Sequence, residues 1–111
     1  MHNKKWDLEE SVALYDLYIK NGFNPSVPQF EVLALSRLLN KRAQILGIPI
    51  TSTYRNENGL KMQLQCIEYV VSNGDHGLSC TSKLFNDTWK LYQEDKDKFY
   101  AILDSFYKKY N

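Results

Sequence analysis

The chain has 111 residues, 43% of them hydrophobic and 14% aromatic, so a folded domain with a modest core is expected rather than a disordered chain. The formal net charge of +1 lacks the strong basic excess that is typical of nucleic-acid-binding proteins. The segment 28–61 is nevertheless mildly basic, with five basic residues against two acidic ones.

Hydrophobic residues recur with the period of an α-helix along most of the chain, whereas the alternation typical of strands is almost absent. The pattern predicts one mainly α domain of about five helices, all-α or winged-helix-like. The predicted helices span residues 8–21, 27–46, 58–72, 83–93 and 96–109. A short β-arm is expected at most near residues 48–54, where threonines and a proline favour extended backbone.

The first two helix starts carry capping signals. Asp7 followed by Glu10 is a variant of the capping box, and Ser26 followed by Gln29 is a second one, with Pro28 in the first turn. We expect both boxes to close the free backbone N–H groups at the helix starts.

The third and fourth helices have similar signals. The third helix is expected to open at Asn56 or Asn58, because asparagine is a preferred N-cap residue. The fourth is expected to be capped by Ser82 or Thr81 after a turn-rich connection.

Two cysteines, Cys66 and Cys80, occur in a chain without a signal-peptide pattern or an apolar run long enough to span a membrane. The simplest interpretation is a cytoplasmic protein with reduced thiols. Together with His76 they provide only three potential zinc ligands, and structural zinc requires four. No metal and no other cofactor is expected.

Signals for catalysis are few. A thiol enzyme built on Cys80 and His76 is one hypothesis, but the two residues share only a turn-rich loop. No phosphate-binding loop and no nuclease or hydrolase signature is present. We therefore expect that this chain alone is not an enzyme.

The stretch TSTYRNENGLKMQLQ, residues 51–65, raises the question of function. On a helix starting near Asn58, the residues Asn58, Lys61 and Gln65 fall on one polar stripe. Amide side chains pair with adenine, arginine pairs with guanine, and lysine pairs with phosphate, so this stripe suits a reader of DNA. The alternative is structural: Arg55 pairs with a carboxylate, the asparagines cap and turn, and the glutamines face water.

Four stretches follow one another along the chain: WDLEESVALYDLY, LALSRLLN, YRNENGLKMQL and GLSCTSKLFNDTW. They resemble the small module at the N-terminus of many bacterial HNH-type, modification-dependent restriction endonucleases. The resemblance covers nearly the whole chain, and its RNxNG and GLSxxSKL elements are its most specific parts. It implies a DNA-binding module, sensing modified bases and coupled to a nuclease domain that does not follow here.

The resemblance and the polar stripe together define the expected site. The expected partner is double-stranded DNA, methylated or not, and a nuclease domain or partner protein is a second expected contact. The residues expected to contact DNA are Tyr54, Arg55, Asn56, Asn58, Lys61, Gln63, Ser82 and Lys83. Trp6, Tyr54 and Trp89 are candidates for stacking on a base, with core packing as the alternative for both tryptophans.

A second hypothesis comes from a different class of function. The last helix carries more tyrosines than one inward stripe requires, with Tyr100, Tyr107 and Tyr110 as the candidates. An exposed aromatic face there would make the chain a small protein-interaction module, for example a phage-encoded inhibitor of a host defence system.

Overall fold

The computed structural model describes residues 5–111, and this part of the chain contains five α-helices and no strand. The five predicted helices are confirmed, with ends displaced by one or two residues. The helices are α1 (Leu8–Lys20), α2 (Gln29–Ile45), α3 (Glu57–Val71), α4 (Lys83–Glu94) and α5 (Lys96–Tyr110).

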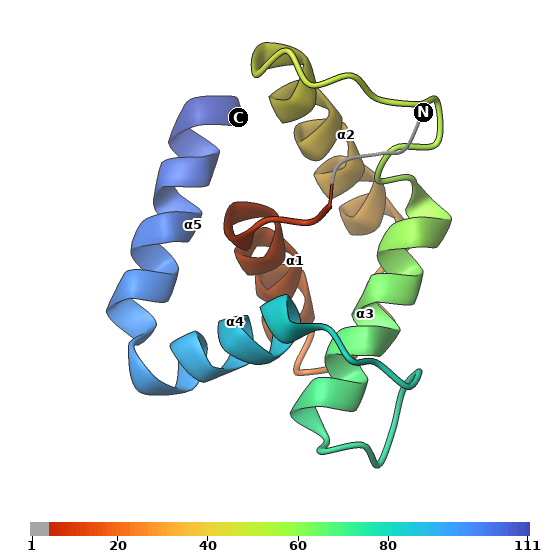
Figure 1. Cartoon of the computed structure of the whole chain (residues 1–111), viewed down its shortest axis with the longest axis vertical. Helices are drawn as coiled ribbons and strands as arrows, with labels where there is room; N and C mark the ends of the chain where they lie inside the picture. Colours follow the sequence, from red (N-terminus) through yellow and green to blue (C-terminus); the bar gives the residue numbers. More distant parts are fainter. Residues whose placement is uncertain (1–4) are drawn as a thin grey trace.

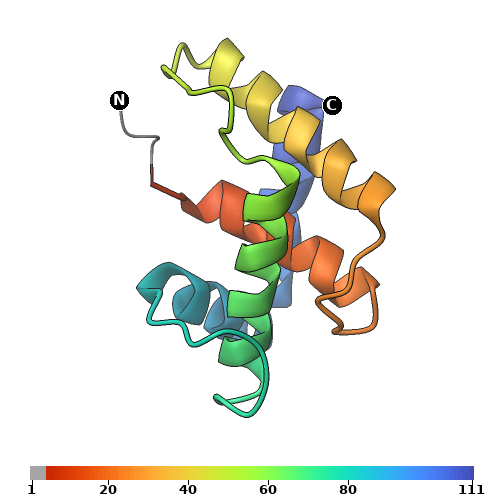
Figure 2. The same cartoon turned by 90° about the vertical axis from the view of Figure 1, so that its right-hand side faces the viewer.

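Helix α1 lies at the centre and contacts each of the other four helices, while α3 and α5 lie on opposite sides of it (Figure 1). Viewed from the side, α3 crosses in front of α1 (Figure 2). Residues 10–16 of α1 are all buried. A helix that is covered on all sides is expected to be the core of its domain, and α1 therefore organises the fold.

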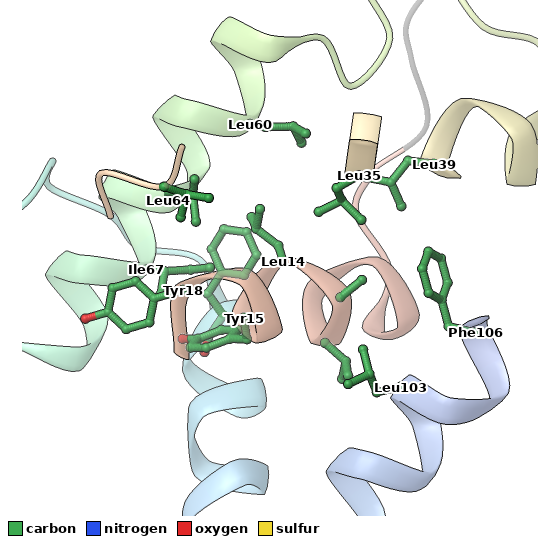
Figure 3. Close-up of a cluster of buried hydrophobic side chains, with 14 of the residues drawn as sticks. Leu14, Tyr15, Tyr18, Leu35, Leu39, Leu60, Leu64, Ile67, Leu103 and Phe106 are labelled. Carbon is green, nitrogen blue, oxygen red and sulfur yellow. The ribbon is translucent and has the colours of Figure 1, made fainter. Parts of the chain in front are cut away.

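The core is a cluster of aliphatic and aromatic side chains around α1. Figure 3 shows Leu14 and Tyr18 of α1 close to Leu64 of α3. The buried hydroxyl of Tyr15 donates a hydrogen bond of 2.7 Å to the carbonyl of Phe85, which satisfies its polar end. Leu35 and Leu39 from α2, Leu60 and Ile67 from α3, and Leu103 and Phe106 from α5 complete the labelled cluster.

The helix starts follow the sequence in part. The capping box of α1 is confirmed: the Glu10 N–H donates to Asp7 Oδ1 (3.0 Å) and the Asp7 N–H donates to Glu10 Oε1 (3.3 Å). The second predicted box is wrong, because α2 begins after Pro28 with no side-chain cap. The Gln29 amide donates to Glu57 of α3 instead (3.1 Å).

Of the two N-cap residues predicted for each of α3 and α4, Asn56 caps α3 and Ser82 caps α4. Asn56 Oδ1 accepts a hydrogen bond from the Gly59 N–H at 2.9 Å, and Ser82 Oγ accepts one from the Phe85 N–H at 3.1 Å. Both caps satisfy a backbone donor that has no partner inside its own helix.

The predicted β-arm at 48–54 is wrong, and with no strand in residues 5–111 a winged-helix-like fold is not supported. The segment ends in a turn, and the carbonyls of Tyr54 and Arg55 at this end accept hydrogen bonds from side chains of α2. Asn40 Nδ2 donates to the carbonyl of Tyr54 (3.0 Å), and Ser36 Oγ donates to the carbonyl of Arg55 (2.7 Å). These bonds fix the end of the segment against α2.

The expectation of reduced thiols is also wrong, because Cys66 of α3 is joined to Cys80 by a disulfide with its Cα atoms 5.3 Å apart. The connection from α3 to α4 therefore folds back along α3. The Leu78 N–H donates to the carbonyl of Gln65 at 3.2 Å. Gly77 has φ +86°, and a side chain there would collide with the same carbonyl, so the close approach requires glycine.

Candidate nucleic-acid interface

Arg55 forms an ion pair inside the protein. Its Nε lies 2.7 Å from Oε2 of Glu10, and a second guanidinium nitrogen lies 3.1 Å from Oε1. The side chains of Arg55 and Glu10 are only 7% and 0% exposed. A two-point pair of this kind fixes the guanidinium plane as well as its position.

The Arg55 guanidinium also lies against two aromatic rings, at 4.6 Å from the ring centre of Trp6 and 4.4 Å from that of Tyr54. Arginine stacks on aromatic faces in this way, and the contact is strengthened by removal from water. Arg55 therefore holds the indole of Trp6 in place from below the surface.

Tyr54 is 1% exposed, and its hydroxyl donates to Glu10 Oε2 at 3.2 Å. Burial and the nearby charge of Glu10 raise the pKa of Tyr54 to about 12. Because neither ring face reaches the surface, Tyr54 does not present a stacking surface in this structure. The structural alternative for the YRN segment accounts for Tyr54 and Arg55.

A second buried arginine lowers the charge available at the surface. Arg42 donates to Glu9 Oε1 (2.6 Å) and to Asp7 Oδ2 (2.7 Å). Burial alone would lower the pKa of Arg42, but these hydrogen bonds and charges outweigh it and raise the pKa. Two of the five basic residues in segment 28–61 are thus compensated by α1, and Arg37, Lys41 and Lys61 remain exposed.

The outer side of α3 is divided between two faces, because 3.6 residues per turn place some polar residues on opposite flanks of the inward stripe. Asn56, Gly59 and Gln63 face Trp6. Asn58 and Lys61 face the connection between α1 and α2 on the other flank. The predicted stripe residues Asn58, Lys61 and Gln65 thus line one hollow, and Gln63, expected at the margin of the stripe, lies on the other flank.

Two adjoining hollows share Trp6 and Gln63, and we call the surface they form the Trp6 surface. The smaller hollow has a volume of about 190 Å³ and is lined by Trp6, Thr53, Arg55, Asn56, Gly59 and Gln63. The larger has a volume of about 550 Å³ and is lined by Lys5, Trp6, Gln63, Ser82, Lys83, Leu84 and Phe85.

The Trp6 surface gathers predicted residues that lie far apart in the sequence: Trp6, Arg55, Asn56, Gln63, Ser82 and Lys83. Sequence reasoning missed Lys5, which lines the same hollow as Lys83. The position of Lys5 directly before Trp6 in the sequence is the signal that could have indicated it.

Asn58 and Lys61 line a different hollow, of about 600 Å³, with Met62, Gln65 and Leu78 among its other lining residues. Lys61 forms an ion pair with Glu57 at 2.6 Å, and this contact lowers the pKa of the Glu57 carboxyl. The two predicted contacts are thus separated from the Trp6 surface by the body of α3.

Trp89 is placed away from the Trp6 surface. Its ring is stacked on Tyr15 and Tyr92, with ring centres 6.2 and 5.7 Å apart, one turn after Phe85 on α4. Core packing, the alternative for this residue, accounts for it. Trp6 packs against Phe85 and also lines the two hollows, and its stacking on a base stays a prediction.

The aromatic face proposed for the last helix is not formed. Tyr110 is 5% exposed, Tyr107 is half-buried, and only Tyr100 of the three is exposed. Tyr107 lies beside Lys20 of α1, Tyr110 beside Arg42 of α2 and Tyr100 beside Tyr92 of α4. The three tyrosines therefore do not form the exposed face that the second hypothesis requires.

Within residues 5–111, no group of three or more His, Cys, Asp or Glu side chains is arranged to hold a metal ion. None of the five helices of this region combines the length and apolar character that a membrane crossing requires. Comparison with family models, with curated proteins and with solved structures finds no match to this chain.

Proposed function

We propose that this chain is a DNA-binding recognition module that contacts double-stranded DNA through the Trp6 surface. The observation that carries the proposal is the meeting of one indole, two amides and two lysines around two adjoining hollows. The resemblance of the RNxNG and GLSxxSKL elements to modules of restriction endonucleases supports it, because both elements contribute residues to this surface.

The residue types suit the chemistry of DNA. Lys5 and Lys83 supply positive charge for phosphates, and Gln63 and Asn56 supply amides for base edges, adenine above all. Gln63 has no hydrogen-bond partner within residues 5–111, and Asn56 uses only its oxygen for the helix cap. Lys83 pairs with Asp87, but both side chains are exposed, so exchanging this pair for a phosphate costs little.

Arg55 has an indirect part in this proposal. Its charge is compensated by Glu10 and its guanidinium lies on Trp6, so it positions the indole rather than contacting DNA. Asn58 and Lys61 remain predicted contacts only for a duplex that reaches around α3 to the neighbouring hollow. Sensing of modified bases, and coupling to a nuclease elsewhere, belong to the same proposal through the resemblance.

An electrophoretic shift panel at low salt tests the proposal with unmodified, cytosine-modified and adenine-methylated duplexes. We expect the chain to shift at least one duplex. Lys83→Ala should weaken this binding, whereas Lys108→Ala should not, because Lys108 is an exposed residue of α5 on the other side of the molecule. Equal retention by all three duplexes would remove the modified-base part. If no duplex is shifted and a pull-down with this chain isolates one protein instead, the interaction-module alternative would be favoured.

A further inference from the structure

We infer that the Trp6 surface binds a single base that has left the DNA stack, which lies on the indole of Trp6 in the larger hollow. The inference rests on the proposed function and specifies its substrate: a duplex with one extruded or mispaired base. The indole of Trp6, the amide of Gln63 and two lysines meet at this hollow.

The indole is fixed before any ligand arrives. Arg55 lies 4.6 Å from its ring centre, and Phe85 meets it edge to face at a centroid distance of 6.0 Å. Leu84 and Phe85 extend the apolar wall of the same hollow. A base inside a duplex exposes its edges but not its faces, so the indole can stack only on a base that has been turned out.

The edge of such a base would meet Gln63, which lines both hollows. Its unpartnered amide offers donors and an acceptor, the pairing capacity that every Watson–Crick edge requires. Asn56 and Thr53 continue this polar lining into the smaller hollow. Recognition of an unstacked base requires an aromatic platform for its face and polar groups for its edge, and Trp6 and Gln63 supply both side-chain types at the same hollows.

The backbone of the extruded nucleotide would be held by cations at the same hollow. Lys5 and Lys83 both line it, and no carboxylate does. The hollow therefore combines an aromatic residue with two lysines, and the exposed pair of Lys83 with Asp87 can be exchanged for a phosphate at little cost. Aromatic and cationic side chains together bind unpaired nucleotides with limited sequence preference.

The test compares one duplex with and without a single central mismatch. Extruding a mispaired base costs less, so the mismatched duplex should bind about tenfold more tightly. Gln63→Ala should reduce this preference, whereas Gln93→Ala, an exposed glutamine on α4, should retain it. In a Trp89→Phe protein, the fluorescence of Trp6 should be quenched by the mismatched duplex.

Two results would overturn the inference and are distinguishable. Equal affinity for both duplexes, still weakened by Lys83→Ala, would reject base extrusion and leave the proposed function in place. A mismatch preference that survives Gln63→Ala without quenching of Trp6 would also reject it. Failure to bind either duplex would reject the proposed function itself.

Discussion

The guanidinium of Arg55 and the carboxylate of Glu10 form a buried two-point ion pair, with Nε and Oε2 2.7 Å apart. Removing one partner of such a pair leaves a charge without compensation, which typically costs about 3–5 kcal/mol. We therefore expect Arg55→Ala to lower the free energy of unfolding in urea by about this amount.

Arg37→Ala, on the exposed side of α2, is the matched control and should change stability by less than about 0.5 kcal/mol. If Arg55→Ala were as stable as Arg37→Ala, the ion pair would not stabilise the fold, and direct contact of Arg55 with DNA would again be the favoured interpretation.

The cap at Asn56 separates a structural role from a binding role. Asn56→Ala should cost about 1 kcal/mol, since the Gly59 N–H loses its acceptor. Asn56→Asp keeps the cap and hence the stability, but it loses the amide donor and adds a negative charge at the Trp6 surface. We expect Asn56→Asp to unfold like the wild type while binding DNA more weakly. Asn58→Ala, exposed within α3, is the control for stability.

Alkaline pH should unfold the protein through buried tyrosines. The pKa of Tyr54 is raised to about 12, from an ordinary value of about 10, by burial and by Glu10. The unfolded chain loses this proton first, so the contribution is complete below pH 10 and is lost as the pH rises towards 12.

Tyr54→Phe removes this ionisation. The stability difference between wild type and Tyr54→Phe, measured by urea unfolding, should therefore shrink or reverse above pH 10. A constant difference from pH 8 to pH 11 would show that Tyr54 titrates alike in the folded and unfolded chains.

The Cys66–Cys80 disulfide closes a loop with a sequence separation of 14. Constraining a loop of this size in the unfolded chain is worth about 3 kcal/mol. A dithiol reductant should therefore lower the urea midpoint of the wild type. A Cys66→Ser, Cys80→Ser variant should unfold like the reduced wild type with or without reductant. Equal midpoints for oxidised and reduced wild type would contradict the role given to this bond.

Local signals account for what the sequence predicts well. The Asp7–Glu10 box, the Asn56 cap and the Ser82 cap each lie within three residues of the group they satisfy. Hydrophobic periodicity predicts the five helices for the same reason, because the apolar residues that share a helix face are only three or four positions apart in the sequence.

Partners that are distant in sequence account for what it misses. The threonines and the proline of residues 48–54 favour extended backbone, but they do not show that Asn40 and Ser36 of α2 bond the carbonyls of Tyr54 and Arg55. Nothing near Arg55 indicates that its carboxylate is Glu10, 45 residues earlier. The same limit applies to the Trp6 surface, which depends on how α1, α3 and α4 pack.

The salt dependence of binding is the sharpest test of DNA binding through the Trp6 surface. Fluorescence anisotropy with a labelled duplex would give the slope of log Kd against log salt for the wild type, Lys83→Ala and Lys108→Ala. Binding through the Trp6 surface predicts a slope reduced by about 1 in Lys83→Ala and unchanged in Lys108→Ala. Identical slopes and affinities for all three proteins, or no binding at low salt, would contradict it.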